Sequence, residues 1–185
     1  SAIGSPGLKP LAAQKLFSNL LHLDLSKNAV FGNLSDICGK VPHVEHLNLA
    51  HTRLSGNLVD ISLLKSLEYL NVAYTSVTGK LGLSPLRSCP KLQYLNLSET
   101  ALEDVSLETL STLKQLRELH LRGCVWLEGD ISSLSTCACL EVLDLSSHKT
   151  MLLAGSLESL SWSDDQTTRV GLSRLRCLNL TNCRY

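Results

Sequence analysis

The chain has 185 residues, a length that suits one ordinary domain or one run of structural repeats. Leucine dominates with 42 copies, whereas aromatic residues make up only 4%. The 17 basic and 17 acidic residues give a formal net charge of zero, which argues against nucleic-acid binding through a basic face. Apolar residues form 44% of the chain, so we expect it to fold. No apolar run is long enough for a membrane-spanning helix, so we expect no membrane insertion.

The N-terminal residues and the cysteines indicate a compartment. No signal peptide is visible in the first ten residues, which lack a charged stretch followed by an apolar one. Seven cysteines at irregular spacing do not form a disulfide framework, and we interpret most of them as reduced thiols in the core. The tight Cys137-Ala-Cys139 pair lacks a second ligand pair for a metal, so we expect no metal and no cofactor. These features favour an intracellular protein, with the cytoplasm as the first choice.

A leucine pattern, L-x-x-L-x-L-x-x-(N/T/C/H), recurs seven times along the chain. Its first residues are Leu20, Val44, Leu67, Leu92, Leu116, Leu140 and Leu175. Successive copies begin 24, 23, 25, 24, 24 and 35 residues apart, so the last interval carries an insertion. Seven copies at a nearly constant period indicate a repeat protein.

Each copy predicts one short strand. Alternate residues such as Leu23 and Leu25 point to one face of a strand, where we expect them and their equivalents to be buried, and the residues between them point to the other face. Strands one repeat apart stack in parallel at about 4.8 Å, which predicts a seven-stranded sheet. The ninth position turns the chain, and Asn, Thr or Cys there can bond turn backbone groups. Between strands, apolar residues recur at every third position, which favours 3₁₀ turns.

Four intervals carry a second motif, L-x-G-x-(L/I). They are Leu54–Leu58, Val77–Leu81, Leu127–Ile131 and Leu153–Leu157. Together the two motifs resemble the leucine-rich-repeat family over residues 8–185, and the 24-residue plant-type repeats in particular. The proline that usually follows the second motif is absent, and Thr, Cys or His replaces most of the usual Asn. The resemblance implies an α/β solenoid, curved, with a parallel sheet on its concave side and 3₁₀ or short irregular segments on its convex side.

The repeats predict a single leucine-rich-repeat domain over residues 1–185, with an insertion loop near residues 161–171. Residues 7–17 resemble the second half of a repeat, and the chain stops at Tyr185 just after a strand motif. A solenoid has to cover its terminal apolar faces. We therefore expect a segment of a longer protein, or a module whose ends are covered by partners.

No catalytic signature occurs: G-x-S-x-G, the Walker A loop, G-x-G-x-x-G and H-E-x-x-H are all missing. We therefore expect no enzyme, and we look for function on the concave surface. Asp and Asn recur at the centre of the strands, where they are expected to form a structural ladder. Tyrosine is different, because exposed tyrosines are frequent hot spots of protein interfaces.

The predicted partner site centres on Tyr69 and Tyr94, which occupy the same position in consecutive repeats. The whole predicted site comprises Tyr69, Tyr94, Tyr74, His46, His51, Arg53, Glu68 and Glu99. It would make the chain a scaffold that binds a protein, not nucleic acid. Two alternatives stay open. One is a structural or accessory subunit of a large assembly, held by its edges and convex side, and the other is the ligand-recognition ectodomain of a receptor.

Overall fold

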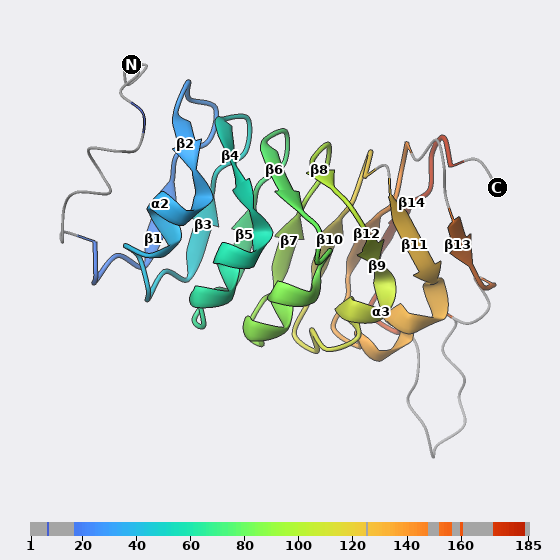
Figure 1. The fold of residues 1–185 in the computed structure, drawn as a ribbon. Helices are drawn as coiled ribbons and strands as arrows, with labels where there is room; N and C mark the ends of the chain where they lie inside the picture. The colour runs from blue at the N-terminus through green and yellow to red at the C-terminus, as the bar shows by residue number, and fades with distance from the viewer. Residues whose placement is uncertain are drawn as a thin grey trace.

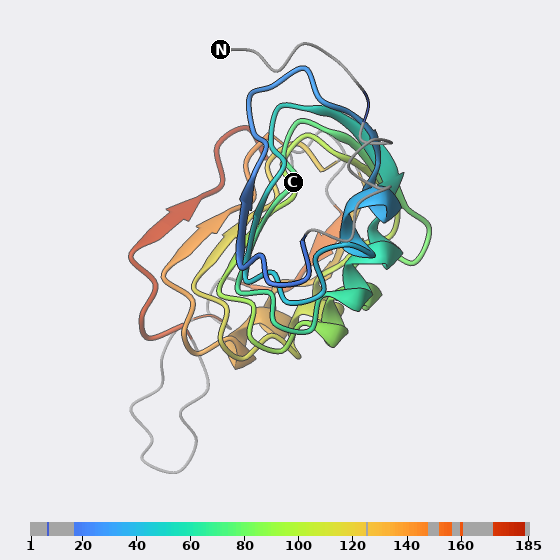
Figure 2. The same cartoon turned by 90° about the vertical axis from the view of Figure 1, so that its left-hand side faces the viewer.

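The computed structural model describes residue 7 and residues 17–124, 126–147, 152–156, 160 and 172–183. The predicted insertion loop at residues 161–171 lies outside the described residues. The chain winds into a stack of similar coils, one per repeat (Figure 1). Viewed along the stack, the strands of one sheet form one side of each coil and the short helices lie on another side (Figure 2). This is the expected curved solenoid.

The largest element is a parallel sheet of seven three-residue strands. In spatial order these are β1 (His22–Asp24), β3 (His46–Asn48), β5 (Tyr69–Asn71), β7 (Tyr94–Asn96), β10 (Glu118–His120), β12 (Val142–Asp144) and β14 (Cys177–Asn179). Each strand is centred on the second leucine of the motif, and these leucines are register partners across the sheet. The predicted strands, their parallel direction and their register are therefore confirmed.

Two smaller parallel sheets, which the sequence analysis did not predict, run beside the large one. The first contains β2 (Phe31–Asn33), β4 (Arg53–Asn57), β6 (Ser76–Gly79) and β8 (Ala101–Leu102). The second contains β9 (Val105–Ser106), β11 (Leu127–Asp130) and β13 (Leu152–Ala154). Four of these strands, β4, β6, β11 and β13, overlap the L-x-G-x-(L/I) segments. The glycine has a packing reason: a Cβ on Gly56, at φ +121°, would come within 2.5 Å of the Asn33 Oδ1 of the preceding repeat.

Short helices close each coil on the convex side. They are α2 (Leu34–Cys38), η1 (Leu58–Leu63), η2 (Ser84–Ser88), α3 (Leu107–Leu110) and η3 (Ile131–Thr136). Three of them are 3₁₀ helices, as the spacing of three predicts, and two are single α-helical turns. One motif residue departs from expectation, because Leu81 is exposed and Leu83 fills the buried position. Both residues lie in the interval from Leu67 to Leu92, which has 25 residues instead of the usual 24. The additional residue is accommodated at this point.

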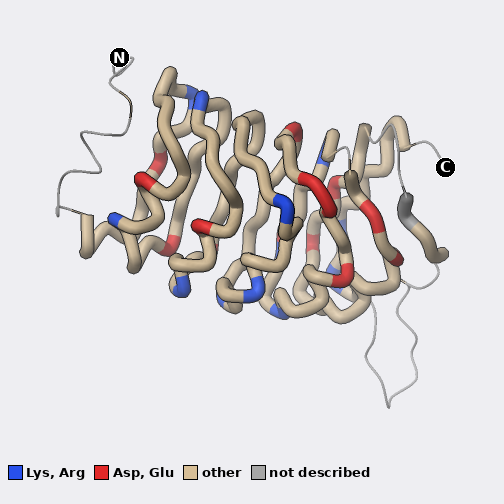
Figure 3. The backbone as a smooth tube through the Cα atoms, viewed as in Figure 1, with Lys and Arg blue, Asp and Glu red and all other residues tan. Residues whose placement is uncertain are grey.

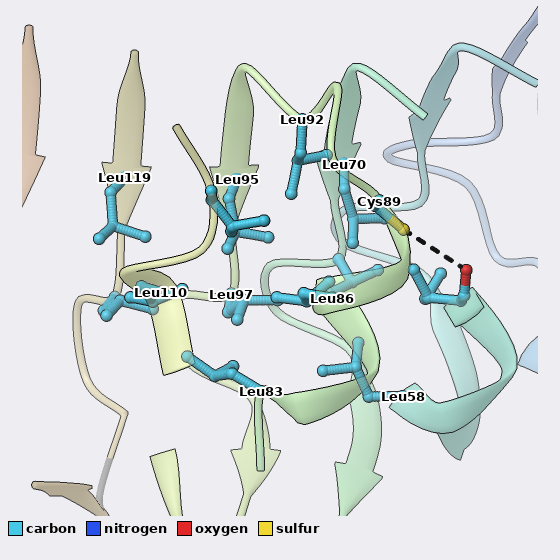
Figure 4. Packing of buried hydrophobic residues seen from close by; sticks show 14 of the residues in the cluster. Leu58, Leu70, Leu83, Leu86, Cys89, Leu92, Leu95, Leu97, Leu110 and Leu119 are labelled. Carbon is cyan, nitrogen blue, oxygen red and sulfur yellow. Dashed lines mark hydrogen bonds between the residues drawn. The ribbon is translucent and has the colours of Figure 1, made fainter. Parts of the chain in front are cut away.

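The core is a column of leucines inside the coils. Between Leu47 and Leu145, the motif residues that point inward from the large sheet are buried. Cys38, Cys89, Cys124 and Cys137 are buried among them. Figure 4 shows Cys89 packed beside Leu70, Leu86 and Leu92, with its sulfur near a carbonyl oxygen of the neighbouring coil. The interpretation of most cysteines as core thiols holds for these four, whereas Cys177 is exposed.

The predicted role of the ninth motif position is also confirmed. The hydroxyls of Thr52, Thr75 and Thr100 donate to the carbonyls three residues earlier, at 2.7, 2.6 and 2.7 Å. These threonines are buried. Each hydroxyl therefore satisfies a buried carbonyl of the turn, and at Leu97 the thiol of Cys124 donates as well, at 3.3 Å.

The two end strands are less protected than the centre. Leu23 and Leu25 are only partly buried, and Leu178 is 41% exposed. The expectation that all strand leucines are buried is therefore wrong at the ends, because a terminal strand has a neighbouring coil on one side only. In Figure 3 several acidic segments lie close together in the C-terminal half of the stack, whereas basic segments recur along the lower edge of the coils.

Candidate protein-binding site on the concave face

The outward face of the seven-stranded sheet, here called the concave face, aligns equivalent residues of successive repeats. In the strand register His22 is paired with His46, His46 with Tyr69, and Tyr69 with Tyr94. These residues stand between the inward-pointing leucines, so their side chains leave the sheet on its outer side. The repeat thus builds a row of rings from residues that are far apart in the sequence.

The rings stack on one another, and we call the set His22, His46, Tyr69, Tyr94 and His120 the aromatic ladder. Centroid distances from His22 through Tyr94 are 3.9, 3.9 and 4.1 Å, and adjacent planes are within 10° of parallel. His120 ends the ladder, tilted by 40° at 5.4 Å from Tyr94. Such contacts hold each ring in place, so the surface is preorganised.

A second row of Asp and Asn residues runs beside the ladder. Each accepts a hydrogen bond from the backbone N–H two residues on, as Asn71 does from Ala73 at 3.1 Å and Asn96 from Ser98 at 3.0 Å. Asn48 Nδ2 also donates to Asp24 Oδ2 at 3.0 Å. These side chains hold the strand ends, in keeping with the predicted structural role of the row.

Tyr74 belongs to a different stack. It lies on His51, with centroids 4.4 Å apart, rather than on the aromatic ladder. Both residues stand at a position that has the left-handed conformation in every repeat, with φ of 55° at His51 and 56° at Tyr74. The tyrosine is 44% exposed. The three predicted concave tyrosines therefore form two groups.

The remaining predicted residues are divided among three places. Arg53 begins β4 and pairs with Phe31, so it belongs to the four-stranded sheet and not to the concave sheet. Glu99 lies 3.9 Å from Arg122 Nε, in the row that contains Tyr74. Glu68 directly precedes Tyr69 and accepts a hydrogen bond from Gln93 Nε2 at 2.9 Å. Glu68 therefore lies at the ladder.

A cavity of about 390 Å³ opens beside the middle of the ladder, and we call it the ladder pocket. It is lined by Glu68, Tyr69, Gln93, Tyr94, Arg117 and Glu118. Gln93, Arg117 and Glu118 were not in the predicted site. The signal for the first two was present, because they occupy the same repeat position as Glu68, directly after the first motif leucine.

Burial shifts the pKa of two ladder residues, Tyr94 and His46. It raises the pKa of Tyr94 to about 12, and nearby Tyr69 and Glu118 act in the same direction against the hydrogen bond with Asn96. Tyr94 therefore keeps its hydroxyl proton at neutral pH. Burial and then the neighbouring His22 lower the pKa of His46, although Asp24 opposes them. At neutral pH both shifts favour the uncharged form of Tyr94 and His46, which suits packing and hydrogen bonding.

The described residues contain no group of three or more His, Cys, Asp or Glu side chains placed to hold a metal ion. In the same part of the chain, no helix is long and apolar enough to cross a bilayer.

Known proteins share both the repeat and the fold. The family model described as "Leucine rich repeat" matches residues 65–125. CD180 antigen of Mus musculus is 33% identical over 136 residues, which are 69% of this chain and 20% of that protein. The chain belongs to the leucine-rich-repeat family.

Two solved structures resemble the solenoid. The plant peptide hormone receptor RGFR1, in complex with RGF2, has a TM-score of 0.59 and 29% identity, covering 74% of this chain and 21% of that one. The Arabidopsis receptor kinase HAESA, in complex with the peptide hormone IDA and the co-receptor SERK1, has a TM-score of 0.71 and 24% identity, covering 90% and 26%. The chain thus spans about a fifth to a quarter of the length of these proteins.

Proposed function

We propose that this chain is a non-catalytic scaffold that binds a protein partner through its concave face. The observation that carries the proposal is the aromatic ladder, in which three successive ring contacts lie at 3.9–4.1 Å on an outward face and adjoin a cavity. The zero net charge favours short-range contact over long-range steering of a highly charged polymer such as nucleic acid.

The energetic argument rests on preorganisation. Binding freezes side chains at an interface, at a cost of roughly 0.5–1.5 kcal/mol for each flexible one. Tyr69 and His46 are already stacked on both faces, so little rotamer freedom remains for them to lose. Their ring edges and the hydroxyls of Tyr69 and Tyr94 are then available to a partner at low entropic cost.

A second candidate is the ligand-recognition ectodomain of a receptor. RGFR1, at 29% identity, is a plant peptide hormone receptor whose structure was solved in complex with RGF2. This relative favours a short peptide as the partner and weighs against a cytoplasmic location. Both candidates use the same face, and they differ in the partner and the compartment. The structural-subunit alternative instead uses the edges and the convex side.

The test is site-specific photo-cross-linking in the native cell. p-Benzoylphenylalanine replaces Tyr74, which is 44% exposed beside the concave face, in one version of the protein. In the matched version it replaces Leu63, which is 55% exposed on η1 of the convex side. Each version is made with and without the Tyr69→Ala/Tyr94→Ala double substitution, and adducts are identified by mass spectrometry.

The proposal expects a defined protein or peptide adduct at position 74 that the double substitution abolishes. Adducts at position 63 alone, unaffected by the double substitution, would favour the structural-subunit alternative. An adduct with a secreted peptide would select the receptor candidate over an intracellular scaffold.

A further inference from the structure

The residues that line the ladder pocket include charged side chains as well as the ladder tyrosines. Two carboxylates line the pocket together with the rings of Tyr69 and Tyr94: Glu68, which directly precedes Tyr69, and Glu118 on β10, the register partner of Tyr94. Its volume of about 390 Å³ is at the small end of the range of roughly 300–1,000 Å³ for ligand pockets. It therefore suits a single long side chain better than a whole small protein element.

Arg117 also lines the pocket, but its guanidinium is ion-paired with a carboxylate that does not line it. Arg117 Nη1 lies 2.9 Å from Glu141 Oε1 of the next repeat. Arg176 also approaches Glu141, at 3.9 Å, from the other side. The Arg117 guanidinium therefore has its own carboxylate, outside the set of residues that line the pocket.

Among the described residues, neither pocket carboxylate has a Lys or Arg partner in an ion pair. Glu68 accepts a neutral hydrogen bond from Gln93 Nε2 at 2.9 Å, and among the described residues no Lys or Arg forms an ion pair with it. Glu118 lies 3.5 Å from His120 Nε2, a contact that is ionic only when the histidine is protonated. The pocket thus offers two carboxylates with acceptor capacity for a visiting donor.

We propose that the ladder pocket receives a lysine or arginine side chain of the partner, an inference that rests on the proposed function. The aliphatic stem would pack against the edges of Tyr69 and Tyr94, and the cationic head would lie between Glu68 and Glu118. An acidic side chain in the same place would face two like charges. The partner segment is therefore cationic at the ladder even though the scaffold as a whole is neutral.

Glu141 is a positioning residue in this arrangement. Its carboxylate pairs with the guanidinium of Arg117, which itself lines the pocket, so neutralising Glu141 frees that guanidinium to compete with the partner's cation. The Glu141→Gln variant should therefore weaken binding although Glu141 does not line the pocket. If the released Arg117 causes the loss of affinity, the Glu141→Gln/Arg117→Gln double variant should recover wild-type binding. If Glu141 has only a structural role, the double variant should still bind weakly.

The experiment selects binders from a displayed library of random twelve-residue peptides on the 185-residue protein. The same selection is run on the Glu68→Gln/Glu118→Gln variant. The control is Glu45→Gln, which removes the equivalent carboxylate one repeat earlier, outside the pocket. Peptides selected on the wild type are then titrated against all variants, with a melting curve for each.

We expect Lys or Arg to be enriched at one position of the wild-type peptides. Their affinity should fall about tenfold or more in the Glu68→Gln/Glu118→Gln variant, the scale of a lost hydrogen bond between charged groups. Binding to Glu45→Gln should change less than twofold or so, as for a distant surface charge. The loss of affinity in the Glu68→Gln/Glu118→Gln variant should also be smaller at high salt, which screens the charges.

Two results would overturn the inference in different ways. If Tyr69→Ala/Tyr94→Ala weakens binding but the selected peptides lack an enriched cation, the cation pocket is wrong and the proposed function stands. If the selected peptides bind all concave variants equally, both are wrong. Failure of the wild type to select any peptide counts against the pocket as well.

Discussion

Tyr69 and Tyr94 stack face to face, with ring centroids 4.1 Å apart and planes within 9° of parallel. The spacing follows from the fold, because the two residues are register partners in adjacent parallel strands, which lie about 4.8 Å apart. The faces of both rings are thereby used within the protein. A partner meets their edges and hydroxyls, and the ladder acts as one rigid surface instead of a set of separate side chains.

The first prediction separates this surface from the core. Tyr69→Ala should lower the free energy of unfolding by about 1–3 kcal/mol, because two aromatic pairs of about 0.5–1.5 kcal/mol each are lost. Leu70→Ala, at the fully buried neighbouring position, should cost about 2–5 kcal/mol because it leaves a cavity. Urea denaturation of the two variants provides the measurement. A larger loss for Tyr69→Ala than for Leu70→Ala would show that the ladder, and not the leucine column, stabilises the fold.

The second prediction concerns pH. The pKa of His46 is lowered from 6.5 by burial and by His22, against the attraction of Asp24. The unfolded chain then takes up a proton at this residue before the folded protein does. The free energy of unfolding should therefore decrease as the pH falls below about 6.5.

Denaturation curves between about pH 7.5 and pH 5.5 check this prediction. The His46→Gln variant should show a smaller decrease than the wild type. Asp24 does not interfere in this range, because hydrogen bonds from Ser26 and Asn48 outweigh the effect of its burial and keep its pKa below 3.8. Equal pH dependence in the two proteins would mean that the His46 proton equilibrium is not linked to folding.

The third prediction concerns the thiols. Burial raises the pKa of Cys89 to about 11 and also raises that of Cys137, so neither forms the reactive thiolate readily at neutral pH. Cys177 is exposed. In the folded protein, iodoacetamide should modify Cys177 first and the buried pair only slowly, and in denaturant all three should react. Mass spectrometry of samples taken over time measures the rate of modification at each cysteine. Modification of Cys89 as fast as that of Cys177 would contradict the packing of the core.

The fourth prediction tests the turn threonines. Thr75→Val keeps the shape of the buried side chain but removes its hydroxyl. In the wild type that hydroxyl donates to the Val72 carbonyl at 2.6 Å. The unsatisfied group should cost about 1–3 kcal/mol. Thr112→Val removes a hydrogen bond of the same kind, to the Thr109 carbonyl at 3.1 Å, at an exposed site. That control should change stability by less than about 0.5 kcal/mol, and equal losses at the two sites would refute the turn argument.

Much of this architecture is predictable because the repeat imposes it. A leucine at every second strand position specifies the inward face, and the constant period specifies the parallel register, so the pairing of Tyr69 with Tyr94 could be predicted from spacing alone. The sequence did not predict the smaller sheets because their strands have only two to five residues, and four of the seven contain glycine, which disfavours strands in isolation. Their stability comes from stacking on the next coil, which a single segment does not reveal.

The site was only partly predictable for a related reason. Stacking along the row follows from the register, but the separation of Tyr74 from Tyr69 depends on the left-handed turn after each strand. The misplacement of Arg53 arose at the same turn, which carries the chain into another sheet. The direction of the Arg117 side chain depends on Glu141, one repeat away. The sequence alone does not reveal which of these contacts between side chains of different repeats form.

The central claim is that the aromatic ladder binds the partner, and calorimetric titration of the cross-linked partner tests it most directly. Tyr69→Ala and Tyr94→Ala should each weaken binding by about 1–3 kcal/mol, the range of interface hot spots. The convex control Leu63→Ala should bind as the wild type does, and melting curves should show all three variants folded. Wild-type affinity in the Tyr69→Ala/Tyr94→Ala double variant would contradict the claim and move the contacts to the edges or the convex side.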